Sequence, residues 1–128
     1  MNILQLKTIL TSGEADAELA SLYGAAGLDA AKARALALSD AFTARFGEDA
    51  REVALISVPG RSELAGNHTD HNHGCVIAAS IDLDVLAIAA PRADGVACVE
   101  SEVTLPLKVA VCLSVRCVNI SMVTTCVT

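Results

Sequence analysis

Apolar residues recur at helical spacing through the N-terminal part of the chain, which predicts helices there. The recurring positions are Ile3, Leu6, Leu10, Leu19 and Leu22. Ser12, followed by Glu14, offers a fresh N-cap between them. We therefore expect two short helices within residues 1–23, with a break near residues 11–13.

A longer helix is predicted after a loop at Gly24–Gly27, with Asp29 as its N-cap. Its apolar face steps by three or four residues through Leu28, Ala31, Ala35, Leu38, Phe42 and Phe46. Gly47 is placed to end this helix. Three basic residues fall mostly off the apolar face and are interpreted as solvated surface: Lys32, Arg34 and Arg45.

From Glu52 onward the pattern changes to short apolar runs, which are typical of strands. The run 53–58 predicts a buried strand that a turn at Pro59-Gly60 ends. Further strands are predicted at 75–79, 83–90 and 96–99, with the turn at 91–95 joining the last two as a hairpin. The fold class that follows is α/β (α+β), with N-terminal helices packed on a small mixed or antiparallel sheet.

The segment from Val103 to the C-terminus differs in composition, because it contains no acidic residue. Apolar residues occupy every odd position from Val103 to Val115, a period of two that predicts one long strand. Two interpretations compete: a genuine edge strand, or a tail unrelated to the natural continuation, for example from a shifted reading frame. We accordingly treat residues 103–128 as an atypical β-prone tail that follows residues 1–102.

Composition narrows the possible functions. A chain of 128 residues fits one modest domain, and 53% apolar with only 2% aromatic residues implies a core of small aliphatic side chains. The net charge of −6 argues against nucleic-acid binding. Five cysteines without C-x-x-C spacing suggest reduced thiols, and neither a signal peptide nor a membrane-spanning run is expected. We expect a cytoplasmic protein that acts on a small molecule; oligomeric state does not follow from the sequence.

Side-chain chemistry is concentrated in residues 59–74, which hold all three histidines. Asp70 can accept two hydroxyl hydrogen bonds, and Asn67 and His68 can each donate and accept. Arg61 offers a rigid, permanently charged fork of donors. Such a set suits a polyhydroxylated ligand beside an anion, such as a sugar beside a phosphoryl group.

Two other interpretations of this loop stay open. A metal site is one, because four good ligands lie close together in sequence: His68, Asp70, His71 and His73. Their spacing is unlike the usual zinc patterns, in which a helix or strand separates pairs of ligands. The other is a turn whose polar side chains satisfy only their own backbone.

The run Pro59-Gly60-Arg61, followed by Gly66-Asn67-His68-Thr69-Asp70-His71-Asn72-His73-Gly74 and then Ile81-Asp82, resembles the galactokinase signature. The resemblance covers about residues 28–90, and its most specific part is G-x-H-T-D-x-N-x-G. It implies that residues 1–102 form the N-terminal part of a galactokinase-like domain, with the signature at 59–82. Galactokinases belong to the GHMP kinases and phosphorylate galactose with ATP and Mg²⁺ at the anomeric hydroxyl, giving galactose 1-phosphate.

The resemblance implies a role for individual residues. Arg61 matches the arginine that stabilises the transferring phosphoryl group, and four residues match those that bind the sugar: Asn67, His68, Thr69 and Asp70. Asn67 departs from the glutamate of many members, which puts sugar affinity in doubt because the charge is lost. His71 replaces a more frequent tyrosine.

Two features of the complete enzyme are missing from this sequence. Nothing between Asp94 and Thr128 resembles the Gly/Ser-rich ATP phosphate loop, and no carboxylate follows Glu102 to serve as the catalytic base. We therefore expect an N-terminal galactokinase fragment whose small-molecule partner is galactose, which binds no ATP or Mg²⁺ productively and is inactive alone; whether it binds the sugar by itself does not follow from the sequence. The alternatives are a non-catalytic sugar-binding or regulatory module and a metal-binding loop protein.

Overall fold

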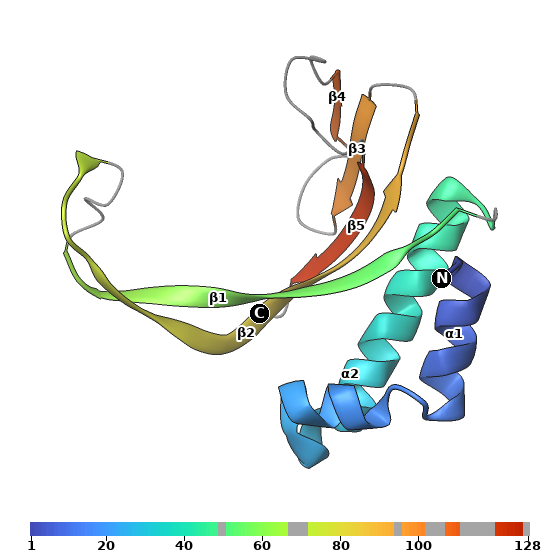
Figure 1. The fold of residues 1–128 in the computed structure, drawn as a ribbon, viewed down its shortest axis with the longest axis horizontal. Coiled ribbons are helices and arrows are strands. Elements are labelled where there is room, and N and C mark those ends of the chain that lie inside the picture. Colours follow the sequence, from blue (N-terminus) through green and yellow to red (C-terminus); the bar gives the residue numbers. More distant parts are fainter. Residues whose placement is uncertain (49–50, 67–71, 94–95, 102–106, 111–119, 127–128) are drawn as a thin grey trace.

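The computed structural model describes residues 1–48, 51–66, 72–93, 96–101, 107–110 and 120–126. Two helices pack beside a five-stranded mixed sheet (Figure 1). The elements are α1 (Ile3–Ser12), α2 (Asp16–Phe46), β1 (Ala54–Ala65), β2 (Ile77–Pro91), β3 (Val96–Ser101), β4 (Leu107–Ala110) and β5 (Ile120–Cys126). The predicted α+β class is confirmed.

The break predicted near residues 11–13 is confirmed, because α1 ends at Ser12 and Gly13 follows with a positive φ of 85°. The helix begins with a capping box in which Asn2 and Gln5 exchange side-chain and backbone hydrogen bonds. No side chain caps the start of α2, so the N-cap predicted at Ser12 is wrong. Glycine at the end of α1 and acidic residues in the first turn of α2 define this boundary instead.

The predicted break between two helices at Gly24 is confirmed, but the loop predicted at Gly24–Gly27 is too long, because α2 (Asp16–Phe46) is helical on both sides of one non-helical residue. Only Gly24 leaves the helical conformation, with φ 72° and ψ 163°, and this single residue kinks the helix. Asp29 lies inside the helix and is not an N-cap. Gly47 ends α2 as predicted, and its N–H donates to the Thr43 carbonyl at 2.9 Å.

The core lies between the predicted face of α2, α1 and the near ends of β1 and β2. Ala31, Ala35, Leu38 and Phe42 are buried as predicted, with Leu28 and Phe46 partly buried against them. Leu22 is the exception, because it is 65% exposed. The sheet contributes alternate residues of β2 together with one residue that precedes β1: Leu86, Ile88, Ala90 and Val53.

β1 and β2 are longer than predicted. The turn predicted at Pro59-Gly60 is wrong, because β1 continues through both residues to Ala65. The strands predicted at 75–79 and 83–90 are one strand, β2, which pairs antiparallel with β1 along its length. Since β1 is at the edge of the sheet, Pro59 can lie within it without removing a hydrogen bond from an inner ladder.

The strand order is β1-β2-β5-β3-β4, which corrects one prediction about the C-terminal half. β3 does not form a hairpin with β2, because β5 lies between them, antiparallel to β2 and parallel to β3. Of the long strand predicted from Val103 to Val115, the structure describes β4 (Leu107–Ala110), and the rest of that prediction lies outside the described residues. β4 pairs antiparallel with β3, so the chain has reversed direction between β4 and β5.

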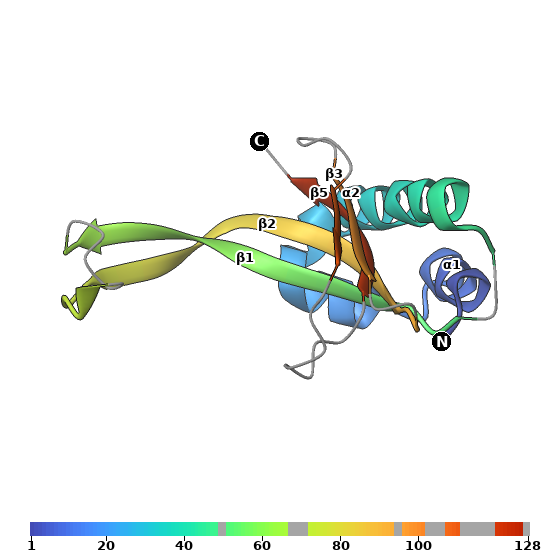
Figure 2. The same cartoon turned by 90° about the horizontal axis from the view of Figure 1, so that it is seen from above.

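The far halves of β1 and β2 extend beyond the helices as a twisted two-stranded arm (Figures 1 and 2). We define the arm as residues 58–65 of β1 and 77–83 of β2. None of these residues is buried. In the part of the chain that is described, no helix is both long and apolar enough to cross a membrane.

Candidate functional site

The described signature residues lie along the arm and at the start of the loop that joins its two strands. β1 carries Pro59 through Ala65, Gly66 leaves the strand, and the chain returns through Gly74 into β2 at Ile77. The loop is therefore held between two sheet strands, as predicted. The outer ends of β1 and β2 lie at the end of the molecule opposite the N-terminus (Figure 1).

The base of the loop is sterically tight at Gly66. Its φ is 116°, and a Cβ placed there would lie 2.6 Å from both the Cys75 carbonyl oxygen and the Val76 Cα. Only glycine allows the two sides of the loop to approach this closely. On the side of the loop that leads into β2, His73 has a positive φ of 62°, in the left-handed region.

Arg61 lies on the exposed arm, paired with Ser80 of β2. The preceding regular pair is Pro59 with Asp84, so three residues of β2 lie opposite Gly60 alone. A side chain at Gly60 would meet Ile81 at 3.1 Å. Glycine therefore lets β2 bulge against β1 immediately before Arg61.

The four predicted sugar-binding residues Asn67, His68, Thr69 and Asp70 lie outside the described residues, as does His71. Of the predicted site, the structure places Arg61 and the base of the loop. Of the four proposed metal ligands only His73 is described. Among the described residues, no group of three or more His, Cys, Asp or Glu side chains is arranged to hold a metal ion.

A polar cluster joins α2 to both strands where the arm leaves the core. Asp84 accepts hydrogen bonds from the Tyr23 hydroxyl at 2.6 Å, the Ser57 hydroxyl at 2.6 Å and the Arg34 Nη2 at 2.5 Å. Arg34 also lies over the Tyr23 ring, 6.0 Å from its centroid. We call these four residues the Asp84 cluster.

Arg34 was predicted to be solvated surface, and this is wrong because its side chain is only 21% exposed and pairs with Asp84. A signal was present in the sequence. Asp84 falls in step with Leu86 and Ile88, the inward-facing positions of the strand, where a carboxylate needs a partner. The partners come from residues far away in the sequence, so the pattern alone could not name them.

Burial raises the pKa of Asp84, but the hydrogen bonds from Ser57, Tyr23 and Arg34, with the charge of Arg34, outweigh it and hold that pKa below its ordinary value. Burial and the hydrogen bond to Asp84 raise the pKa of Tyr23. At neutral pH the cluster is therefore an ionised carboxylate held by a neutral phenol, a hydroxyl and a guanidinium.

The Asp84 cluster should make stability depend on pH. A lowered pKa in the folded state stabilises the protein above the ordinary value of 3.8, and this contribution is lost as pH falls through the folded-state pKa. Urea unfolding across pH should show Asp84→Asn less stable than the parent at neutral pH, with the gap closing below 3.8. Asp29→Asn, which removes an exposed carboxylate from α2, is the charge-matched control. A gap that stays constant with pH would contradict this account.

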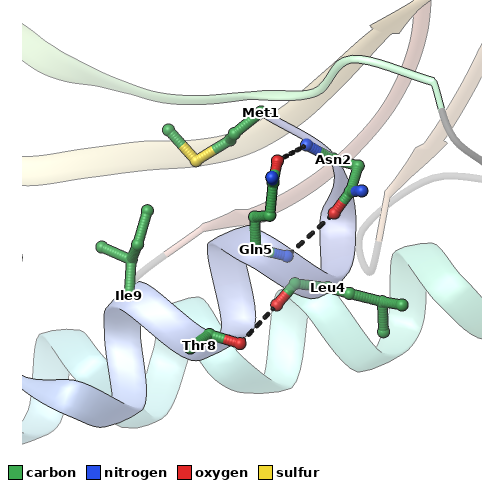
Figure 3. Close-up of a pocket in the computed structure, with 6 residues that line it drawn as sticks. All are labelled: Met1, Asn2, Leu4, Gln5, Thr8 and Ile9. Atoms are coloured by element: carbon green, nitrogen blue, oxygen red, sulfur yellow. Dashed lines mark hydrogen bonds between the residues drawn. The ribbon is translucent and has the colours of Figure 1, made fainter.

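A surface pocket of about 480 Å³ lies at the start of α1 (Figure 3). Its lining residues are Met1, Asn2, Leu4, Gln5, Thr8 and Ile9. The polar groups are already engaged, since Asn2 and Gln5 bond each other and the Thr8 hydroxyl donates to the Leu4 carbonyl. With no converging polar groups left to orient a ligand, we assign no function to this pocket.

Comparison with known proteins supports the resemblance in the N-terminal part. The galactokinase galactose-binding signature matches residues 40–91. The chain is 43% identical over 55 residues to the galactokinase of Canis lupus familiaris and 43% identical over 58 residues to that of Lactococcus lactis subsp. lactis. These matches cover 43% and 45% of this chain and 14% of each relative.

The fold is also similar to a solved structure. The crystal structure of Lactococcus lactis galactokinase complexed with galactose matches with a TM-score of 0.54 at 24% identity, covering 70% of this chain and 30% of that chain. At this identity the likeness concerns the fold. Together with the signature match, it shows that the N-terminal part of this chain carries the galactokinase galactose-binding signature on a galactokinase-like fold.

Proposed function

We propose that this chain is the galactose-binding part of a galactokinase, the enzyme that transfers the γ-phosphate of ATP to the anomeric hydroxyl of galactose. The observation that carries the proposal is the signature match over residues 40–91. The arm supports it, because it presents Arg61 and both ends of the signature loop away from the core. The free thiols of Cys75 and Cys98 suit the cytoplasm, where we place this function.

In this proposal the loop residues bind the sugar. The Asp70 carboxylate accepts hydrogen bonds from two hydroxyl groups of galactose, which a charged acceptor holds more strongly than a neutral one. Asn67 and His68 bind further hydroxyls, and Thr69 belongs to the same block. Asn67 contributes an uncharged contact where many galactokinases have a carboxylate, so we expect weaker binding than in those enzymes.

The role of Arg61 differs from that of the loop residues. Its guanidinium is a planar, positively charged group that carries several N–H donors in a fixed geometry. In a complete galactokinase it would stabilise the charge that develops on the transferring phosphoryl group. The residues of this chain do not fit ATP or Mg²⁺. The sequence contains no Gly/Ser-rich phosphate loop, and no Asp or Glu follows Glu102 to serve as the catalytic base. We therefore propose that the chain binds sugar but does not turn over by itself.

Titration calorimetry with galactose tests this proposal. The chain should bind galactose in about the millimolar range or better, and Asp70→Ala should weaken binding at least about tenfold, because a hydrogen bond to a charged group contributes about 1.5–3 kcal/mol. Asp29→Ala, a change on the exposed surface of α2, is the matched control. Glucose, which differs in configuration at carbon 4, tests specificity.

If titration of the folded parent chain with galactose gave no heat of binding, the proposal would be overturned. A coupled ADP-release assay on the same sample provides the second arm. Galactose-dependent turnover by this chain alone would refute the proposal that the chain binds the sugar but does not bind ATP productively.

A further inference from the structure

The arm lacks the features that normally determine which residues of two strands pair. It is a two-stranded ribbon with no buried residue, and large apolar side chains are exposed on it, including Leu64 at 68% and Ile77 at 63%. Burial on one face is what usually specifies register, so pairing within such a ribbon is weakly specified. A ribbon of this kind is also marginally stable by itself.

The position of Arg61 depends on that register. Successive side chains of a strand point to opposite faces, so a slip of one residue would move every arm side chain of one strand to the other face of its partner. Arg61 pairs with Ser80 in the next pair after Pro59–Asp84 and the bulge at Gly60, so its position depends on how β1 and β2 are aligned at the Pro59–Asp84 pair. The alignment must therefore be set before the arm begins.

The Asp84 cluster lies at that point. Asp84 pairs with Pro59 in the last regular pair before Arg61, and its side chain is 10% exposed. The bond from Ser57 to Asp84 joins β1 to β2, while Tyr23 and Arg34 tie the same carboxylate to α2 on both sides of the kink at Gly24. A single carboxylate thus links three elements.

A change in the register of β2 against β1 would break specific contacts in the Asp84 cluster. If β2 moved by one residue, Leu83 or Val85 would take the place of Asp84 opposite Ser57, Tyr23 and Arg34. The guanidinium would then face an apolar side chain in a site where it is only 21% exposed, and the carboxylate would lose its three donors. The cluster therefore disfavours a slip of β2 by one residue in either direction.

We propose that Asp84 is a positioning residue: held by Tyr23, Arg34 and Ser57, it sets the register of β1 against β2 and thereby places Arg61. The inference depends on the proposed function only for the role of Arg61 beside a galactose ligand. The alignment of the strands is a property of this chain with or without a ligand.

Nuclear magnetic resonance on the full chain tests the proposal through contacts between backbone protons of paired residues. The parent should show contacts for Arg61 with Ser80 and Ser62 with Ala79. In Asp84→Asn these contacts should be lost, or share intensity with shifted contacts of Arg61 to Ala79 or Ile81, while the signals of α1 stay unchanged. Asp29→Asn is the charge-matched control and should keep the parent pairing.

A second pair of variants guards against a failure of Asp84→Asn to fold. Ser57→Ala removes the side-chain hydrogen bond between β1 and β2 but leaves the Arg34–Asp84 pair. It should weaken the backbone contacts of Arg61 with Ser80 and of Ser62 with Ala79. Ser57→Thr keeps the hydroxyl and should restore them. A cluster that only adds stability would lower the unfolding midpoint in Ser57→Ala without shifting any pairing contact, and that result would overturn the proposal.

Galactose affinity gives the functional readout. If about one molecule in ten of Asp84→Asn holds the native register, its apparent affinity should fall about tenfold, because only the competent fraction binds. Unchanged affinity together with unchanged pairing would overturn the proposal. A parent chain that binds no galactose would overturn the proposed function, while the pairing contacts would still decide the role of Asp84.

Discussion

Gly66→Ala should destabilise the protein by about 2–6 kcal/mol and abolish galactose binding. The positive φ of 116° is unsuited to an alanine, which costs about 1–3 kcal/mol. The new Cβ would also lie 2.6 Å from backbone atoms of Cys75 and Val76, and such overpacking costs about another 1–3 kcal/mol. Because those atoms belong to the backbone, relief requires the base of the loop to open. Urea unfolding and a galactose titration measure the two effects.

Gly47→Ala is the matched control for this change. Gly47 also has a positive φ, 86°, but nothing lies within 4 Å of a Cβ placed there. It should show only the cost of the backbone conformation, about 1–3 kcal/mol, with galactose binding retained. Equal losses in the two variants would mean that the close approach of Gly66 to the opposite side of the loop contributes nothing.

Leu38→Ala should destabilise the fold by about 2–5 kcal/mol. Leu38 is 0% exposed and lies in the core shared by α1, α2 and the near end of β2. Removing its side chain leaves a cavity, because a close-packed core relaxes only partly around the missing atoms. Thermal or urea unfolding, monitored by the helical circular dichroism signal, measures the loss.

Leu22→Ala is the same substitution on the same helix at a residue that is 65% exposed. It should change the free energy of unfolding by no more than about 0.5 kcal/mol. The comparison tests the corrected helix face, because helical spacing alone predicted that both leucines face the core. A large loss in Leu22→Ala would indicate that the N-terminal part of α2 packs against the rest of the protein more closely than described.

The helical layer could be predicted from the sequence because its information is local. Residues such as Ala35, Leu38 and Phe42 lie three or four positions apart, and helix geometry places them on one face in any context. The glycines were harder to interpret. Gly24 and Gly27 together suggested a loop, but only Gly24 departs from helical geometry, and packing of the following turns against the core keeps the rest of the segment helical.

The sheet was less predictable because strand pairing joins distant parts of the chain. Pro59-Gly60 has the chemistry of a turn, yet pairing with β2 keeps β1 extended through it. β5 lies between β2 and β3, a placement that no local pattern near residue 96 could indicate. The same reason explains why Arg34 was misinterpreted: its partner Asp84 is fifty residues away in sequence.

By itself the sequence determined the chemistry of this protein: the signature around Arg61 and Asp70, the family it resembles and the apolar faces of the helices. These depend on residue type and short spacing, which the chain order records directly. Only the tertiary structure decided where Arg61 lies, on the edge strand of a two-stranded arm. It also decided how Tyr23, Arg34 and Ser57 meet Asp84 where the arm leaves the core, because contacts between side chains far apart in sequence exist only after the helices and strands have packed together.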